Sequence, residues 1–83
     1  MESKVKRTGV VAIMVSDRAA VPVVNDLLSE FNGLIIGRIG LPRPEQGSNV
    51  IALIVEGSND EVGALAGRLG SINGISGKSL LFK

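Results

Sequence analysis

Two stretches of the chain, residues 10–15 and 50–55, are apolar at every position. The first reads Val-Val-Ala-Ile-Met-Val and the second reads Val-Ile-Ala-Leu-Ile-Val. A strand with one face in water alternates apolar and polar residues, whereas a strand covered on both faces is apolar throughout. Both stretches have the length and the β-branched content of strands. The fold must therefore provide cover for both faces of these two strands.

A helix is predicted after the first of these strands. Its apolar residues recur at helical spacing and form one stripe, made of Val21, Val24, Leu27, Leu28 and Phe31. Pro22 lies near the start, where a missing N–H costs little. Asn32-Gly33 is typical of a helix end.

A second helix is predicted after the second apolar stretch. Ser58 and Glu61 have the spacing of a capping box. The buried stripe that follows consists of Val62, Leu65, Leu69 and Ile72. Glycines at 63, 67 and 70 form a second stripe beside it, which indicates that something approaches this backbone closely. The candidates are a neighbouring strand, another subunit or a ligand, and packing is favoured over ligand binding. Asn73-Gly74 ends this helix. Residues 76–82 then form the last predicted strand.

Between the two helices the chain contains a predicted hairpin. Residues 34–41 form one strand and residues 50–56 the other, joined by a segment at 40–47 with two prolines and flanking glycines. The element order is thus strand, helix, strand, strand, helix, strand. Right-handed crossovers fold this order into a ferredoxin-like βαββαβ two-layer sandwich of the α+β class. It has a four-stranded antiparallel sheet with both helices on one face.

The chain has 83 residues, which is enough for one domain. We expect residues 1–7, which contain Lys4, Lys6 and Arg7, to be a flexible N-terminus. Residues 8–83 then form the single domain.

Two helices cover only one face of such a sheet, so the other face needs another cover. In the first strand Val10, Ala12 and Met14 point one way and Val11, Ile13 and Val15 the other. Leaving four to six large side chains in water forgoes roughly 6–18 kcal/mol of burial. We expect copies of the chain to cover this face as a homodimer or homotetramer. The alternative is a monomer with an exposed apolar sheet, and the sequence leaves open which set of side chains meets the partner.

Arg38 gives an orientation for the strand at 34–41. A guanidinium is costly to bury beneath the helices. We therefore expect Leu34, Ile36 and Arg38 on the open face, in the interface with Val10, Ala12 and Met14. Ile35, Ile39 and Leu41 are then expected in the core.

Composition removes several classes of function. The chain has no cysteine and no histidine, so it has no disulfide, no thiolate ligand and no imidazole base. We expect no metal site, no cofactor and no enzyme activity of its own. A net charge of +1 and two aromatic residues argue against direct binding of nucleic acid. The start of the chain does not read as a signal peptide and no apolar run is long enough for a membrane span, so we expect a cytoplasmic protein without a membrane partner.

The candidate ligand site is the loop Ser16-Asp17-Arg18, which precedes the first helix. A helix N-terminus binds anions and small polar ligands readily. The alternative is that Ser16 or Asp17 only caps the helix.

The segment Asn-Asp-Glu-Val-Gly-Ala-Leu-Ala-Gly-Arg-Leu-Gly at 59–70 resembles small bacterial proteins of the iron-only hydrogenase system regulator family. Asn-Asp-Leu-Leu at 25–28, Gly-Arg-Ile-Gly-Leu-Pro at 37–42 and Ile-Asn-Gly-Ile at 72–75 extend the resemblance over nearly the whole chain. The same segment is similar to the ACT-like C-terminal domain of nickel-responsive repressors. The resemblance implies association through the sheet and a small effector near the loop at 16–18. The nickel site does not carry over, because histidine and cysteine are absent.

Together these features favour a regulatory module that binds a small-molecule ligand and forms oligomers. The family description implies transcriptional regulation. A protein-interaction module or a small regulatory subunit of an enzyme is the alternative, and a DNA-binding regulator is a third hypothesis.

Overall fold

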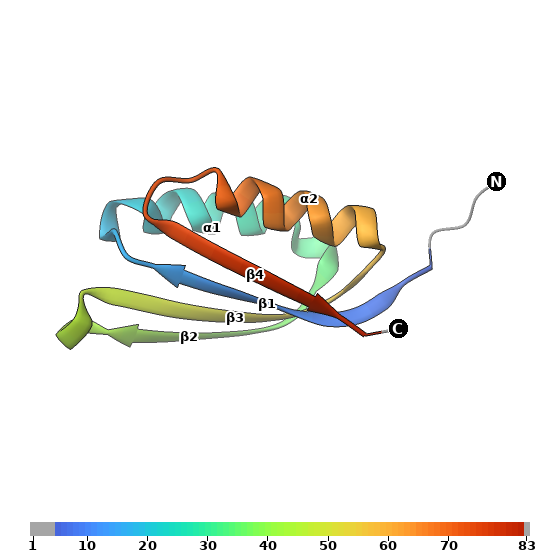
Figure 1. Cartoon of the computed structure of the whole chain (residues 1–83), viewed down its shortest axis with the longest axis horizontal. Coiled ribbons are helices and arrows are strands. Elements are labelled where there is room, and N and C mark those ends of the chain that lie inside the picture. Colours follow the sequence, from blue (N-terminus) through green and yellow to red (C-terminus); the bar gives the residue numbers. More distant parts are fainter. Residues whose placement is uncertain (1–4, 83) are drawn as a thin grey trace.

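The computed structural model describes residues 5–82, and this part of the chain forms four strands and two α-helices in the order βαββαβ (Figure 1). The elements are β1 (Arg7–Val15), α1 (Val21–Glu30), β2 (Ile35–Arg43), β3 (Ser48–Gly57), α2 (Asn59–Gly70) and β4 (Ile75–Leu81). The flexible N-terminus predicted for residues 1–7 lies partly outside the described residues, and of that segment Arg7 belongs to β1.

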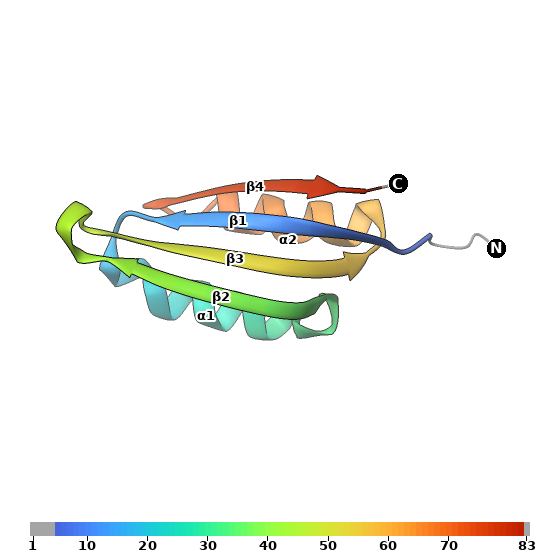
Figure 2. The same ribbon diagram turned by 90° about the horizontal axis from the view of Figure 1, so that it is seen from below.

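The strands form one antiparallel sheet in the order β2-β3-β1-β4 (Figure 2). The two strands with unbroken apolar runs, β1 and β3, are the inner ones, and each is paired on both sides. Both helices pack on the same face of the sheet (Figure 1). The predicted ferredoxin-like fold is therefore confirmed.

The ends of α2 and α1 follow from local chemistry. The Ser58 hydroxyl accepts a hydrogen bond from the Glu61 N–H at 3.1 Å, and Glu61 Oε1 accepts one from the Ser58 N–H at 2.9 Å. This is the predicted capping box. Pro22 lies in the first turn of α1, as expected. The helix ends at Phe31, and a 3₁₀ turn at Asn32–Leu34 then leads into β2.

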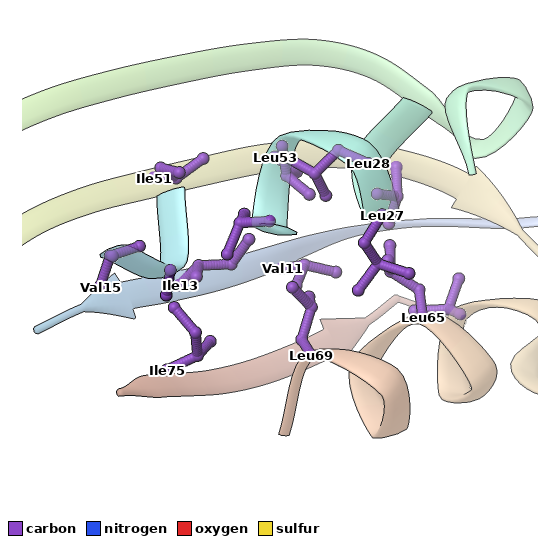
Figure 3. Close-up of a cluster of buried hydrophobic side chains, with 14 residues drawn as sticks. Val11, Ile13, Val15, Leu27, Leu28, Ile51, Leu53, Leu65, Leu69 and Ile75 are labelled. Atoms are coloured by element: carbon purple, nitrogen blue, oxygen red, sulfur yellow. The ribbon is translucent and has the colours of Figure 1, made fainter. Parts of the chain in front are cut away.

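The core lies between the sheet and the helices and is almost wholly aliphatic (Figure 3). The strands contribute side chains at alternate positions, and the helices contribute their stripes: Val11, Ile13 and Val15; Ile51, Leu53 and Val55; Val24, Leu27 and Leu28; Val62, Leu65 and Leu69. Each such side chain stabilises the fold by about 1.5–3 kcal/mol when fully buried. This assignment settles the orientation of β1, because Val10, Ala12 and Met14 must then lie on the helix-free side.

β2 differs from its predicted orientation because it contains a bulge. Ile35 pairs with Val55, but the next pair is Gly37 with Ile54, so one extra residue lies between them. The extra residue reverses the alternation of all following side chains. Arg38 consequently stands opposite Leu53, which is on the helix side of the sheet.

Three predicted placements in β2 are therefore wrong. Arg38 does not face the open side: its Nη2 donates a hydrogen bond to Asn25 Oδ1 of α1 at 2.8 Å. The guanidinium avoids the cost of burial because it remains exposed at the edge of the sheet. Ile39 and Leu41 are not in the core: they are 70% and 55% exposed.

The residues at and before the bulge also differ from one another in burial. Ile35 is half-buried on the core side, as predicted, and the neighbouring Ile36 is 63% exposed. Leu34 was expected on the open face but precedes the strand, in the 3₁₀ turn. It is half-buried, and its Cδ2 would lie 2.9 Å from a Cβ added at Gly57.

The glycines of α2 do not mark a close contact within the described chain. A Cβ added at position 63, 67 or 70 would meet no atom of another element within 4 Å. Close packing by a neighbouring strand is therefore wrong for residues 5–82, and close approach of another subunit or a ligand stays a prediction. A different glycine is structurally required: Gly74 has φ of 82°, and a Cβ there would lie 2.6 Å from Asp17 Cβ.

We expect Gly74→Ala and Gly67→Ala to change stability in opposite directions. Gly74→Ala introduces a left-handed strain and a clash, and should lower the free energy of unfolding by about 2 kcal/mol or more. Gly67→Ala adds a methyl group in open space on a helix and should raise it by up to about 1 kcal/mol. Urea denaturation followed by circular dichroism measures both, and equal effects would contradict this description of the two sites.

Candidate functional site

The helix-free face of the sheet is built from three cross-strand rows on β2, β3, β1 and β4. The register aligns Leu41, Val50, Met14 and Ser76; then Ile39, Ala52, Ala12 and Lys78; then Gly37, Ile54, Val10 and Leu80. We call these positions the helix-free face; Figure 2 views the sheet from this side. Its side chains are apolar except at Ser76 and Lys78, which both lie on the edge strand β4.

Large apolar side chains on this face remain in contact with water. Leu80 is 61% exposed, Met14 44% and Ile54 42%, in addition to Ile39 and Leu41. At roughly half exposure each of these five forgoes on the order of 1 kcal/mol of burial. The sum, about 5 kcal/mol, is comparable to the lower range of the stability of a whole domain.

The centre of the face is low, although its middle row ends in the larger Ile39 and Lys78 at the two edges of the sheet. Ala12 and Ala52 occupy the middle row, and the larger Val10, Met14 and Ile54 occupy the flanking rows. A shallow hollow of about 180 Å³ opens between Ala12, Met14, Val50 and Lys78. Such a surface fits another apolar surface with ridges of its own.

Charged residues lie beyond the rows, at opposite ends of the strands. Arg43 follows Leu41 on the same face at the hairpin end, opposite Ser48. Glu56 follows Ile54 at the other end, opposite Thr8. Both are exposed. Arg43 and Glu56 therefore place opposite charges at the two ends of these strands, and Lys6 lines a cleft together with Glu56.

The predicted ligand loop divides into two structural residues and one arginine. The Ser16 N–H and the Ser16 hydroxyl both donate to the Gly74 carbonyl oxygen, at 2.8 and 3.0 Å. Asp17 Oδ1 accepts the Ala19 N–H at 3.0 Å and so caps the 3₁₀ turn that leads into α1. Asp17 is therefore a cap, but of the 3₁₀ turn and not of α1 itself, whose N-cap Ala20 has no side-chain hydrogen bond. Within residues 5–82 the Arg18 side chain makes no hydrogen bond comparable to those of Ser16 and Asp17.

Arg18 lies beside a small hollow at the hairpin end of the molecule. The hollow is about 20 Å³, and Arg18 lines it with Pro42 and Asn49. A neighbouring hollow of about 200 Å³ shares Pro42 and Asn49 and is lined by Arg38 and Asn25. Sequence reasoning missed this second hollow because it placed Arg38 on the other face.

The opposite end of the molecule has a wider cleft of about 500 Å³ between the end of α1 and the start of α2. Phe31 and Leu34 line it together with acidic residues that include Glu30 and Asp60. Arg68 already engages this rim: its Nη2 lies 3.2 Å from Glu30 Oε1, and its Cζ is 5.9 Å from the centroid of the Phe31 ring. One acidic residue of the cleft, Glu30, is therefore already paired with a cation of the same chain, Arg68.

Neither a metal-ligand cluster nor a membrane-spanning helix is found among the described residues. Among residues 5–82 no group of three or more acidic, histidine or cysteine side chains is placed to hold a metal ion. None of the helices in that range is both long and apolar enough to cross a membrane.

Comparison with known proteins gives a family match and a related solved structure. Residues 7–79 match the model of the TM1266-like family, described as iron-only hydrogenase system regulators. A solved structure of an uncharacterized protein, TM1266 from Thermotoga maritima, is 39% identical with a TM-score of 0.91. The alignment covers 95% of this chain and 100% of that one. No curated protein matches the sequence.

Two more distant structures come from CPII of Thiomonas intermedia K12, a nitrogen regulatory PII-like protein. The apo form is 12% identical with a TM-score of 0.49, over 96% of this chain and 95% of that chain. The form bound to ADP, AMP and bicarbonate is 14% identical with a TM-score of 0.43, over 98% and 97%. Identity and TM-score are too low to relate those ligands to this chain.

We expect Asp17→Ala to affect stability as the loss of a cap. The substitution leaves the Ala19 N–H without its acceptor and should lower the free energy of unfolding by about 1 kcal/mol. Asp17→Asn, whose amide oxygen can accept the same bond, should lower it by much less. Chemical denaturation of the three proteins measures this, and an equal loss in both variants would show that the carboxylate has another role.

Proposed function

Because the chain belongs to the TM1266-like family of iron-only hydrogenase system regulators, we propose that it is a regulatory module that self-associates through the helix-free face and binds a small ligand. The observation that carries this proposal is the apolar face itself, with Ile39, Leu41 and Leu80 more than half exposed. The family description supports regulation. The ligand would bind at the hairpin end, where Arg18 lies.

The occupant of the face is a second copy of the chain. Self-association about a two-fold axis is the common form of protein oligomer, and it requires a face that is complementary to itself. In an antiparallel stack, with the axis lying across the strands, the middle row crosses its own copy. Ala12 and Ala52 then allow close approach at the centre, and the larger Ile39 and Lys78 meet their own copies at the two edges. The two flanking rows exchange, and Leu41 then lies over the partner's Gly37, a large side chain over a position with none.

The charges at the ends of the face support the same arrangement. An antiparallel stack brings the hairpin end of one copy to the opposite end of the other. Arg43 of each copy then approaches the partner's Glu56, while Lys78, which lies in the middle row on the edge strand β4, meets the partner's Lys78 at the rim. A parallel stack, with the axis along the strands, would place β2 over the partner's β4 and would keep Arg43 and the partner's Glu56 at opposite ends. Opposite charges at the rim favour the correct register and disfavour the wrong one.

The size of the chain gives a further reason for assembly. A domain of 83 residues buries a limited core, and small domains commonly gain stability from disulfides, metals or partner subunits. Cysteine is absent from the sequence, so a disulfide is not available. Covering the helix-free face would add the burial that five exposed side chains forgo.

We expect Met14→Lys and Ile13→Lys to separate assembly from folding. Ile13 is buried in the core and Met14 is 44% exposed on the helix-free face. Met14→Lys should keep native circular dichroism and sediment at the monomer mass, because a charge in the interface opposes the stack. Ile13→Lys should unfold the protein, because it places an unpaired charge in the core.

An unchanged oligomer mass for Met14→Lys would contradict the proposal. If the wild-type chain is a monomer and a different protein with a defined stoichiometry occupies the helix-free face, the alternative function as a regulatory subunit takes its place. A second face variant, Ile39→Lys, guards against a local effect at Met14, since it lies on another strand of the same face.

Charge reversal tests the orientation of the stack. Arg43→Glu should weaken association at least about tenfold at low salt, because it meets the partner's Glu56. The double variant Arg43→Glu/Glu56→Arg should restore most of the affinity, since it exchanges the two signs. Sedimentation equilibrium measures the dissociation constants. A double variant as weak as the single one would exclude the antiparallel arrangement.

A further inference from the structure

The hollow between α1 and the edge strand β2 exists because one position of β2 lacks a side chain. Gly40 stands opposite the core residue Ile51, on the helix side of the sheet. A Cβ added at Gly40 would meet nothing within 4 Å. The space, about 200 Å³, is bounded by Val21 and Asn25 of α1 and by Arg38 of β2.

Arg38 is held at the rim of this hollow in a fixed position. Its Nη2 donates to Asn25 Oδ1 at 2.8 Å, which ties the end of the side chain to α1. A guanidinium carries five N–H donors. Within residues 5–82 the Arg38 side chain donates from one nitrogen, Nη2. The others remain available to an acceptor, and Asn49 lines the same hollow with an amide.

The chemistry of the walls selects the charge and shape of a ligand. The described residues that line the hollow include no acidic side chain. Val21 and Ile51 supply aliphatic surface on the inner side. An anion with a planar pair of oxygens suits a guanidinium, which binds a carboxylate through two parallel hydrogen bonds. An ammonium group would have no carboxylate to pair with in this hollow.

We propose that this hollow binds a small carboxylate with a short aliphatic tail. The carboxylate pairs with Arg38, and the tail lies against Val21 and Ile51 in the space left by Gly40. The hollow of about 200 Å³ has room for a short-chain acid. Asn25 is a positioning residue, because it orients Arg38. This proposal rests on the ligand-binding half of the proposed function and is independent of self-association.

The test is a titration of the ¹⁵N-labelled full chain with 3-methylbutanoate, followed by NMR. We expect saturable shifts of the Arg38, Asn25 and Gly40 amide signals, with a dissociation constant on the order of 1 mM for a ligand of this size. The uncharged 3-methylbutanamide and the amino acid leucine are matched in tail and should bind at least about tenfold more weakly. Equal shifts with the amide, or no saturable shift with the acid, would overturn the proposal.

A variant of Arg38 and a matched control variant localise the binding. Arg38→Gln should weaken 3-methylbutanoate at least about tenfold, because it removes the cation. Arg68→Gln removes the same charge at the other end of α1, where Arg68 contacts Glu30, and should change the affinity less than about twofold. Wild-type affinity in Arg38→Gln, or an equal loss in both variants, would overturn the proposal.

Gly40→Val tests the same site without a change of charge, in case Arg38→Gln disturbs the fold. Gly40 does not have a positive φ, and the new side chain fits into open space, so the melting temperature should stay equal or rise. The branched side chain occupies the hollow and should abolish binding. Unimpaired binding would contradict the site. Repeating the titration on Met14→Lys separates the two proposals, since binding should persist whether or not copies associate.

Discussion

The rest of the structure depends on β1, the inner strand that is apolar on both faces. It pairs with β3 along one edge and with β4 along the other, so its backbone is satisfied within the sheet. Val11, Ile13 and Val15 are almost fully buried beneath the helices. β1 lies inside the sheet between β3 and β4 (Figure 2), so its alternate side chains form the centre of the opposite face. A strand of this composition therefore determines both the core and an apolar surface that the two helices cannot cover.

The bulge in β2 connects the two surfaces to which we assign functions. One extra residue after Ile35 turns Ile39 and Leu41 toward the helix-free face and extends its apolar rows to the edge of the sheet. The same offset turns Arg38 and Gly40 toward the helix side. There Arg38 provides the cation of the hollow, and Gly40, which has no side chain, leaves the hollow open. Without the bulge the arginine would stand on the self-association face and the isoleucine beneath α1. The β2 sequence satisfies both roles only in the shifted register.

Much of this fold could be predicted from the sequence because its local signals agree. The apolar stripes, the capping box at Ser58 and the two unbroken strands all indicate the same βαββαβ order, which the structure confirms. The bulge could not be predicted from strict alternation, which allows one parity for a whole strand. The adjacent pair Ile35-Ile36 followed by Gly37 is the signal that was available, since bulges accommodate glycine. At the loop 16–18, sequence reasoning weighed capping against ligand binding, and only the hydrogen bonds of Ser16 and Asp17 show how those groups are used.

The central claim is that the helix-free face is covered by a second copy of the chain. Sedimentation equilibrium of the unmodified protein tests it most directly, at about 10 µM, where a complex with a micromolar dissociation constant is mostly assembled. The account predicts a mass that is at least twice the 8.6 kDa of one chain. A single species at 8.6 kDa at that concentration would contradict it.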